Sequence, residues 1–118
     1  MRVAGFGFRA SVSVAALQEV LALAGGNVSL IATAEAKVAT PGFQAFARQT
    51  GLPVRAIAPD GLRAHRVAGS DLVQRQFGTG SVAESAALAA AGPGARLIGA
   101  RVTSRDGTAV AAIAEGSS

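Results

Sequence analysis

The chain has 118 residues, half of them hydrophobic, and a net charge of +4 from 11 basic and 7 acidic side chains. This length supports one domain with one core and is too short for two. The absence of cysteine excludes disulfides, iron–sulfur clusters and thiolate zinc sites. The first residues, MRVAGFGFRAS, match neither a signal peptide nor a membrane span, because glycines interrupt a short apolar run. We therefore expect one cytoplasmic domain over residues 1–118, with a frayed tail at 115–118.

The basic side chains indicate the class of partner. All but one of them are arginines, whose planar guanidinium binds carboxylates and phosphates through paired donors. They are scattered along the chain, and five Phe are the only aromatic residues. Nucleic-acid binding usually needs clustered charge together with stacking aromatics. We expect a small polyanionic ligand, with no nucleic acid and no membrane as partner.

Strand and helix patterns alternate along the first half of the chain. Short apolar runs predict buried strands over residues 2–8, 27–33 and 53–58. Ser11 and Ser13 offer N-caps to a helix with an apolar stripe through Leu17, Val20, Leu21 and Leu23. Thr40, followed by a proline, opens a second helix whose inward residues are Phe43, Phe46 and Ala47.

The second half of the chain predicts a helix and a hairpin. Residues 59–77 are the least regular part, with a short helix expected on either side of Gly69. An alanine-rich helix is predicted over 82–91, then strands over 96–103 and 108–114 joined by a turn at Asp106-Gly107. The fold class is therefore α/β: a three-layer α/β/α sandwich whose mixed, mostly parallel five-stranded sheet ends in an antiparallel hairpin.

Folds of this class bind ligands outside the carboxyl ends of their strands. The loops expected there are 9–13, 33–40 and 59–70, and they hold most of the polar side chains that could meet a ligand: Arg9, Ser11, Thr33, Glu35, Lys37, Arg63, His65 and Arg66.

Two sequence features are only weak evidence for a cofactor or metal site. GFGFRAS (5–11) partly matches a dinucleotide fingerprint, but Ala10 replaces the third glycine, and the first two fall inside the strand. Glycines there also fit close packing of a helix on the strand. His65 is the only histidine and has no cysteine or acidic cluster beside it, so we expect no metal site and no cofactor.

Glu84 has two competing interpretations. Ser81-Val82-Ala83-Glu84 fits a capping box, in which Ser81 and Glu84 bond each other's backbone amides at a helix start. Alternatively, Gly78-Thr79-Gly80 leaves free amides at the same helix start, where a ligand could bind. The residue types alone favour the cap. A functional carboxylate would instead need its charge, either to take a proton or to fix a cationic partner such as Lys37.

Several segments, in this order, resemble one known family: GFGFRAS at the start, LIATAEAK (30–37), GLPV (51–54), GSVAESAALAAAG (80–92) and TAVAAIA (108–114). The series resembles the cobalamin-biosynthesis domain found as CobE and as the C-terminal part of CbiG, and it covers nearly the whole chain. The resemblance implies a three-layer α/β/α domain. It also implies a role with corrin intermediates, which carry acetate and propionate groups around an apolar ring. In CbiG the domain is fused to another region, so the lactone-opening activity of that enzyme is not carried over.

The resemblance also implies which residues belong to the functional site. Thr33 and Lys37 match the family's Ala-Thr-x-x-x-Lys loop, Glu84 its Val-Ala-Glu, and Ser70 a serine before the central helix. The sequence departs from the pattern in two places: Ala10-Ser11 replaces an Arg-Gly pair, and Arg101 stands where a lysine is common.

The function expected from the sequence is a cobalamin-biosynthesis protein that binds a precorrin or corrin intermediate. Its alternatives are a hydrolase or isomerase acting on the macrocycle, and a structural subunit that joins other cobalamin-pathway enzymes. The expected catalytic residue is Glu84. The expected ligand-binding residues are Arg9, Ser11, Thr33, Lys37, Ser70, Gly78 and Ser81.

Overall fold

The structure is a computed structural model, and it describes residues 1–64 and 80–116. Its elements in chain order are β1 (Arg2–Phe8), α1 (Val14–Ala24), β2 (Leu30–Ala34), the 3-10 helix η1 (Glu35–Lys37), α2 (Pro41–Thr50), β3 (Val54–Ile57), α3 (Pro59–Ala64), α5 (Gly80–Ala91), β4 (Arg96–Thr103) and β5 (Ala109–Glu115). Each element expected from the described part of the sequence is present, with ends shifted by a few residues.

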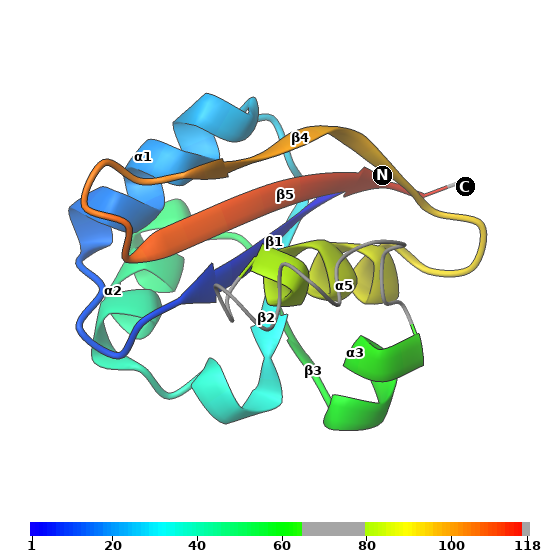
Figure 1. Ribbon diagram of the computed structural model, residues 1–118, viewed down its shortest axis with the longest axis horizontal. Helices are drawn as coiled ribbons and strands as arrows, with labels where there is room; N and C mark the ends of the chain where they lie inside the picture. The colour runs from blue at the N-terminus through cyan, green and yellow to red at the C-terminus, as the bar shows by residue number, and fades with distance from the viewer. Residues whose placement is uncertain (65–79, 117–118) are drawn as a thin grey trace.

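The strands form one sheet in the order β3-β2-β1-β5-β4 (Figure 1). β1 pairs with β2 and β2 with β3 in parallel, whereas β5 is antiparallel to both β1 and β4. Only β5 therefore runs against the other strands. The mixed, mostly parallel sheet with a terminal antiparallel hairpin is confirmed.

An aromatic core fills the space between one face of the sheet and helices α1 and α2. Phe6 and Phe8 from β1 meet Phe43 and Phe46 from α2, and all four rings are fully buried. Burial of four such side chains is a major contribution to the stability of a small domain. The sequence correctly placed Phe43 and Phe46 inward.

Alanine and glycine bring α5 close to the opposite face. Ala83, Ala86 and Ala87 are fully buried, and a Cβ added to Gly5 of β1 would lie 2.1 Å from the carbonyl oxygen of Ala83. α3 packs on the same side, where Leu62 joins the cluster formed by α5, β1, β2 and β3. The three layers are thus α1 and α2, the sheet, and α3 with α5 (Figure 1). Gly5 serves close packing, as the packing interpretation of GFGFRAS requires.

Two details differ from the expectations. Leu23 was placed in the apolar stripe of α1 but is 58% exposed, because six residues after Leu17 the helix has turned that side chain to the far side. The chain was expected to fray from residue 115, yet β5 includes Glu115, and the Gly116 amide donates to the Met1 carbonyl at 2.8 Å. Pairing with β1 holds this end in place. No helix among residues 1–64 and 80–116 is long and apolar enough to cross a membrane.

Candidate functional site

Four strands end at one edge of the sheet, because β4 runs in the same direction as β1, β2 and β3. The loops after these strands gather there, and the β4–β5 turn joins them. The Arg9 amide donates to the Thr108 carbonyl at 2.9 Å, which ties the loop after β1 to that turn. This is the edge at which folds of this class place a ligand.

The loop after β1 presents two of the expected ligand-binding residues. The side chains of Arg9 and Ser11 are exposed, and neither has a hydrogen-bond or ion-pair partner among the described residues. Ser13, not Ser11, caps α1: its Oγ accepts from the Ala16 amide at 3.1 Å. The adjacent α2 supports the loop, since a Cβ on Gly42 would lie 2.2 Å from the Val12 carbonyl oxygen.

The other two residues described here lie at the end of β2 and just after it: Thr33 is inside the strand, not in the following loop as expected, and Lys37 follows in η1. Thr33 is fully buried, and its Oγ1 donates to the Phe6 carbonyl at 2.8 Å. That hydroxyl joins two parallel strands under the site. Lys37 lies in η1, half-buried, and makes no ion pair with any described residue. Lys37 is therefore available to an anion, whereas Thr33 lies beneath the surface.

Glu84 and Arg101 form an ion pair between α5 and β4. Arg101 Nη1 donates to Glu84 Oε1 at 3.1 Å, and the side chains are 31% and 12% exposed, respectively. Arg101 precedes Val102, which aligns with Ala111 and, through it, with Phe6 of β1. The pair therefore lies toward the carboxyl end of the sheet. Burial in less polar surroundings strengthens such a pair relative to one in water.

The capping-box interpretation of Glu84 does not describe its contact. α5 already begins at Gly80, so Ser81 lies inside the helix rather than before it, and the Glu84 carboxylate bonds Arg101. Helix ends shift by a residue or two between definitions, but the carboxylate contact does not depend on that boundary. Glu84 has a cationic partner, as a functional carboxylate requires, but that partner is Arg101 and not Lys37.

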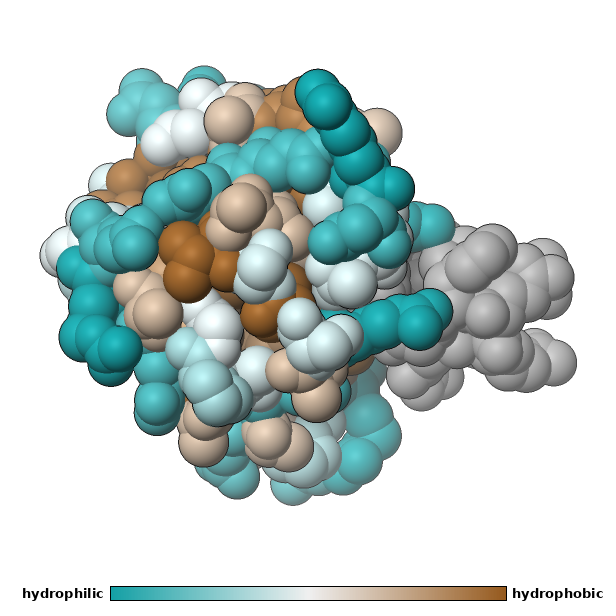
Figure 2. All heavy atoms as spheres, turned by 90° about the vertical axis from the view of Figure 1, so that its left-hand side faces the viewer, coloured by the Kyte–Doolittle hydropathy of each residue, from teal (hydrophilic) through white to brown (hydrophobic). Residues whose placement is uncertain are grey.

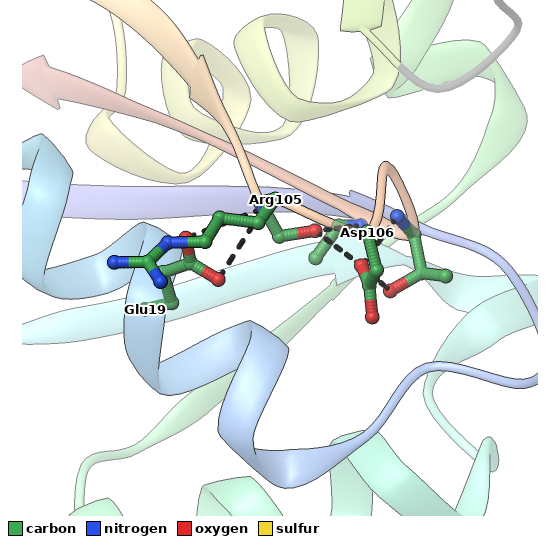
Figure 3. A network of polar contacts seen from close by, with 6 residues as sticks. Glu19, Arg105 and Asp106 are labelled. Atoms are coloured by element: carbon green, nitrogen blue, oxygen red, sulfur yellow. Dashed lines mark hydrogen bonds and ion pairs between the residues drawn. The ribbon is translucent and has the colours of Figure 1, made fainter.

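The β4–β5 turn is held by a polar network (Figure 3). Asp106 Oδ1 accepts from Ser104 Oγ and Thr108 Oγ1, each at 2.7 Å. Hydrogen bonds from Thr108, and then from Ser104, lower the pKa of Asp106 below its ordinary value. Glu19 of α1 accepts from the Arg105 backbone amide at 3.2 Å and pairs with its guanidinium at 3.6 Å. The turn is thereby fixed beside α1.

Figure 2 shows the side of the molecule where α1, α2 and the β4–β5 turn lie. Hydrophilic residues surround a smaller apolar area on this face. A polar rim around an apolar centre is the surface character that an amphipathic polyanion needs.

The remaining predicted residues have no structural assignment. Ser70, Gly78 and His65 lie outside the described residues, and so does the side chain of Ser81. Within residues 1–64 and 80–116, no three His, Asp or Glu side chains gather in a way that would hold a metal ion.

The sheet and its two helical layers define a small three-layer α/β/α domain. The sequence profile of the family described as "Cobalamin synthesis G C-terminus" matches residues 2–114, so the chain belongs to that family. No curated protein sequence gives a significant match.

Solved structures agree with this membership. The cobalamin biosynthesis protein chiG from Agrobacterium tumefaciens is 33% identical, with a TM-score of 0.75 and full coverage of both chains. CobE, a protein from the cobalamin (vitamin B12) biosynthetic pathway, is 31% identical over 97% of this chain and 89% of its own, with a TM-score of 0.74. A putative cobalamin biosynthesis protein G homolog from Sulfolobus solfataricus shares the fold at 16% identity and a TM-score of 0.68. It aligns with 96% of this chain and 36% of its own.

Arg101, the partner of Glu84, was not among the site residues expected from the sequence. The sequence marked it only as a departure from the family pattern, on a strand outside the three strand–helix units. The missed signal was strand direction: a hairpin whose second strand is antiparallel to β1 makes its first strand parallel to β1. That direction brings Arg101 toward the same end of the sheet as Arg9 and Lys37.

Proposed function

We propose that this domain binds a precorrin or corrin intermediate of cobalamin biosynthesis at the carboxyl edge of its sheet. One observation carries the proposal: three cationic side chains from different parts of the sequence lie toward this one end of the sheet. They are Arg9 after β1, Lys37 after β2 and Arg101 in β4. Membership in a cobalamin-biosynthesis family supports this class of ligand.

The charges fit the chemistry of such a ligand. A corrin intermediate carries several carboxylates around a large apolar ring, so its binding site needs separated cations beside an apolar surface. Arg9 and Lys37 lack ion-pair partners among the described residues, which leaves them free to meet carboxylates. Arg101 uses Nη1 toward Glu84, and a guanidinium has further N–H donors that a carboxylate of the ligand can accept.

Glu84 acts in this proposal as the functional carboxylate of the site. Its negative charge fixes the Arg101 guanidinium in one orientation, which lowers the entropic cost of binding an anion there. A carboxylate so placed is also the candidate acid or base for any reaction on the bound macrocycle. Ser11 adds an exposed hydroxyl beside Arg9.

The test is a visible-absorption titration with two corrins that share the ring. One is a cobalt corrin with free carboxylates, and the other carries the same groups as amides. The proposal predicts saturable binding of the polycarboxylate that weakens as salt rises, and much weaker binding of the amidated ring. Equal affinity for the two, or no binding of either, contradicts it. Product analysis of the bound polycarboxylate then separates binding alone from hydrolase or isomerase activity.

A further inference from the structure

We propose that the outer edge of β3, together with the groove between β3 and α2, binds an extended acidic segment of a partner protein as a sixth strand. β3 is the last strand on its side of the sheet and pairs only with β2 among the described residues. This surface runs along the outer side of β3 and is not at the carboxyl ends of the strands. The proposal therefore does not depend on the ligand proposed above.

The ladder between β2 and β3 determines which backbone groups face outward. Ile31 is aligned with Val54, and its amide donates to the Pro53 carbonyl at 3.0 Å. In a parallel ladder alternate residues of a strand bond the same neighbour, so Pro53 and Arg55 face β2. The amides and carbonyls of Val54 and Ala56 therefore point away from the sheet, where an added strand can pair with them.

A groove lies beside these outward groups. It has a volume of about 270 Å³ and is lined by residues of α2, β3 and the preceding loop: Val38, Phe43, Gln44, Ala47, Arg48 and Val54. Val54 is 39% exposed, one of the few large hydrophobic side chains of the described chain that remain open. Because alternate side chains of a strand point to one face, an added strand would lay an apolar side chain into this groove.

The charges at this edge select an acidic partner. Arg48 lines the groove, and Arg55 stands on the opposite face of β3 from Val54. Both side chains are exposed, and neither forms an ion pair with a described residue. If the apolar side chains of an added strand enter the groove, the carboxylates that alternate with them lie on the opposite face of the sheet, where Arg55 stands.

The same charges disfavour a second copy of the chain as the occupant. The antiparallel alignment that uses both outward residues of each copy sets Val54 opposite Ala56 of the other. It also sets Arg55 opposite Arg55, and like charges directly opposite each other destabilise a strand pair.

The other sheet edge is less open to an added strand. β4 carries a register shift between Ile98 and Val102, and Gly99 within it has a φ of +70°. Bulges of this kind interrupt the row of backbone groups and protect an edge from pairing. Of the two edges formed by the described strands, β3 is therefore the better suited to strand addition.

The first test uses a synthetic peptide that alternates glutamate and valine, titrated into the isotope-labelled protein and followed by amide NMR. We expect saturable binding in which the amides of Val54 and Ala56 shift and become protected from exchange. A peptide alternating lysine and valine should leave them unchanged. Unmoved Val54 and Ala56 amides, equal binding of the two peptides, or concentration-dependent dimers that block these amides would overturn the proposal.

Variants make the test specific. Ala56→Pro removes an outward amide that the sheet does not use, so the protein should fold and lose strand addition. The double variant Arg48→Ala/Arg55→Ala should weaken binding of the acidic peptide roughly tenfold at low salt. Arg96→Ala, which removes one exposed charge from the opposite edge, is a control and should bind like the parent. If Ala56→Pro does not fold, the arginine variants carry the test, and unchanged affinity in the double variant contradicts the proposal.

Discussion

The Glu84 carboxylate on α5 accepts a hydrogen bond from the Arg101 guanidinium on β4, with Nη1 and Oε1 3.1 Å apart. This contact links a helix of the outer layer to the edge strand of the sheet near its carboxyl end. It gives the glutamate a partner that an isolated capping residue would lack. We therefore expect the charge of Glu84, and not only its hydrogen-bonding oxygen, to affect ligand binding.

The first prediction separates that charge from the size of the side chain. Glu84→Gln keeps the shape and one acceptor oxygen but removes the ion pair, so binding of the polycarboxylate corrin should fall about tenfold or more. The free energy of unfolding should fall by only about 1 kcal/mol, because the pair is partly exposed to solvent. Calorimetric titration and chemical denaturation measure the two effects.

A double-mutant cycle with Arg101→Gln supplies the control. If Glu84 acts through Arg101, the second substitution should add little to the loss of affinity caused by the first. Full additivity, or parent-like binding by Glu84→Gln, would show that the pair is structural and that the ligand contacts lie on the loops alone.

Lys37 offers a prediction in which stability should not change. Its side chain is half-buried and has no ion-pair partner among the described residues. Lys37→Ala should reduce affinity for the polycarboxylate corrin and flatten the salt dependence of binding, with an unchanged melting temperature. Arg48→Ala, which removes an exposed cation from α2, is the comparison variant and should bind the corrin normally. Equal affinity of Lys37→Ala and the parent would remove Lys37 from the site.

Gly5 gives a prediction about the fold. A Cβ at this position would lie 2.1 Å from the Ala83 carbonyl oxygen and 2.5 Å from the Ala87 nitrogen, both of them backbone atoms that cannot move alone. Gly5→Ala should therefore lower the free energy of unfolding by about 3 kcal/mol or more. Gly61→Ala is the control, since among the described residues its Cβ would meet a side-chain methyl, Ile57 Cγ2 at 3.0 Å, and no backbone atom. It should lower the free energy of unfolding by much less than Gly5→Ala does, and equal melting curves for both variants would contradict the close packing of α5.

The sequence predicted the layers of this fold because each layer has a local signature. Alternating apolar runs marked the strands, Phe43 and Phe46 marked the inner side of α2, and Asp106-Gly107 marked the hairpin turn. The extension of β5 to Glu115 was missed because it depends on contacts with Arg2, at the other end of the sequence, and with Arg96 on the neighbouring strand β4. Local propensity carries no information about such pairings.

The site was harder to predict for the same reason. The loop residues Arg9 and Lys37 follow directly from the order of strands and helices. The pairing of Glu84 with Arg101 depends on where β4 lies relative to α5, and that placement requires the whole sheet. Thr33 matched a family motif, but the sequence did not show that its hydroxyl would be used by the Phe6 carbonyl.

Glu115 should make stability depend on pH. A hydrogen bond from Arg2 lowers the pKa of this carboxyl below its ordinary value, and Arg96 contributes as well. A lowered pKa in the folded state means that the stabilisation is present above the ordinary carboxyl pKa and is lost as pH falls through the lowered one. Denaturation of Glu115→Gln across the acid range should show a smaller loss of stability than the parent. A parallel pH profile for the two proteins would assign the acid sensitivity to other carboxyls.

The most direct test of the proposed function is an amide NMR map of the labelled protein saturated with the diamagnetic cobalt(III) polycarboxylate corrin. Corrin binding at the carboxyl edge predicts shifts that gather in residues 9–13, 35–40 and around Arg101, and that shrink together in Glu84→Gln. The β3 edge should stay unchanged. Absence of binding, or shifts confined to the opposite end of the sheet near Arg2 and Glu115, would contradict it.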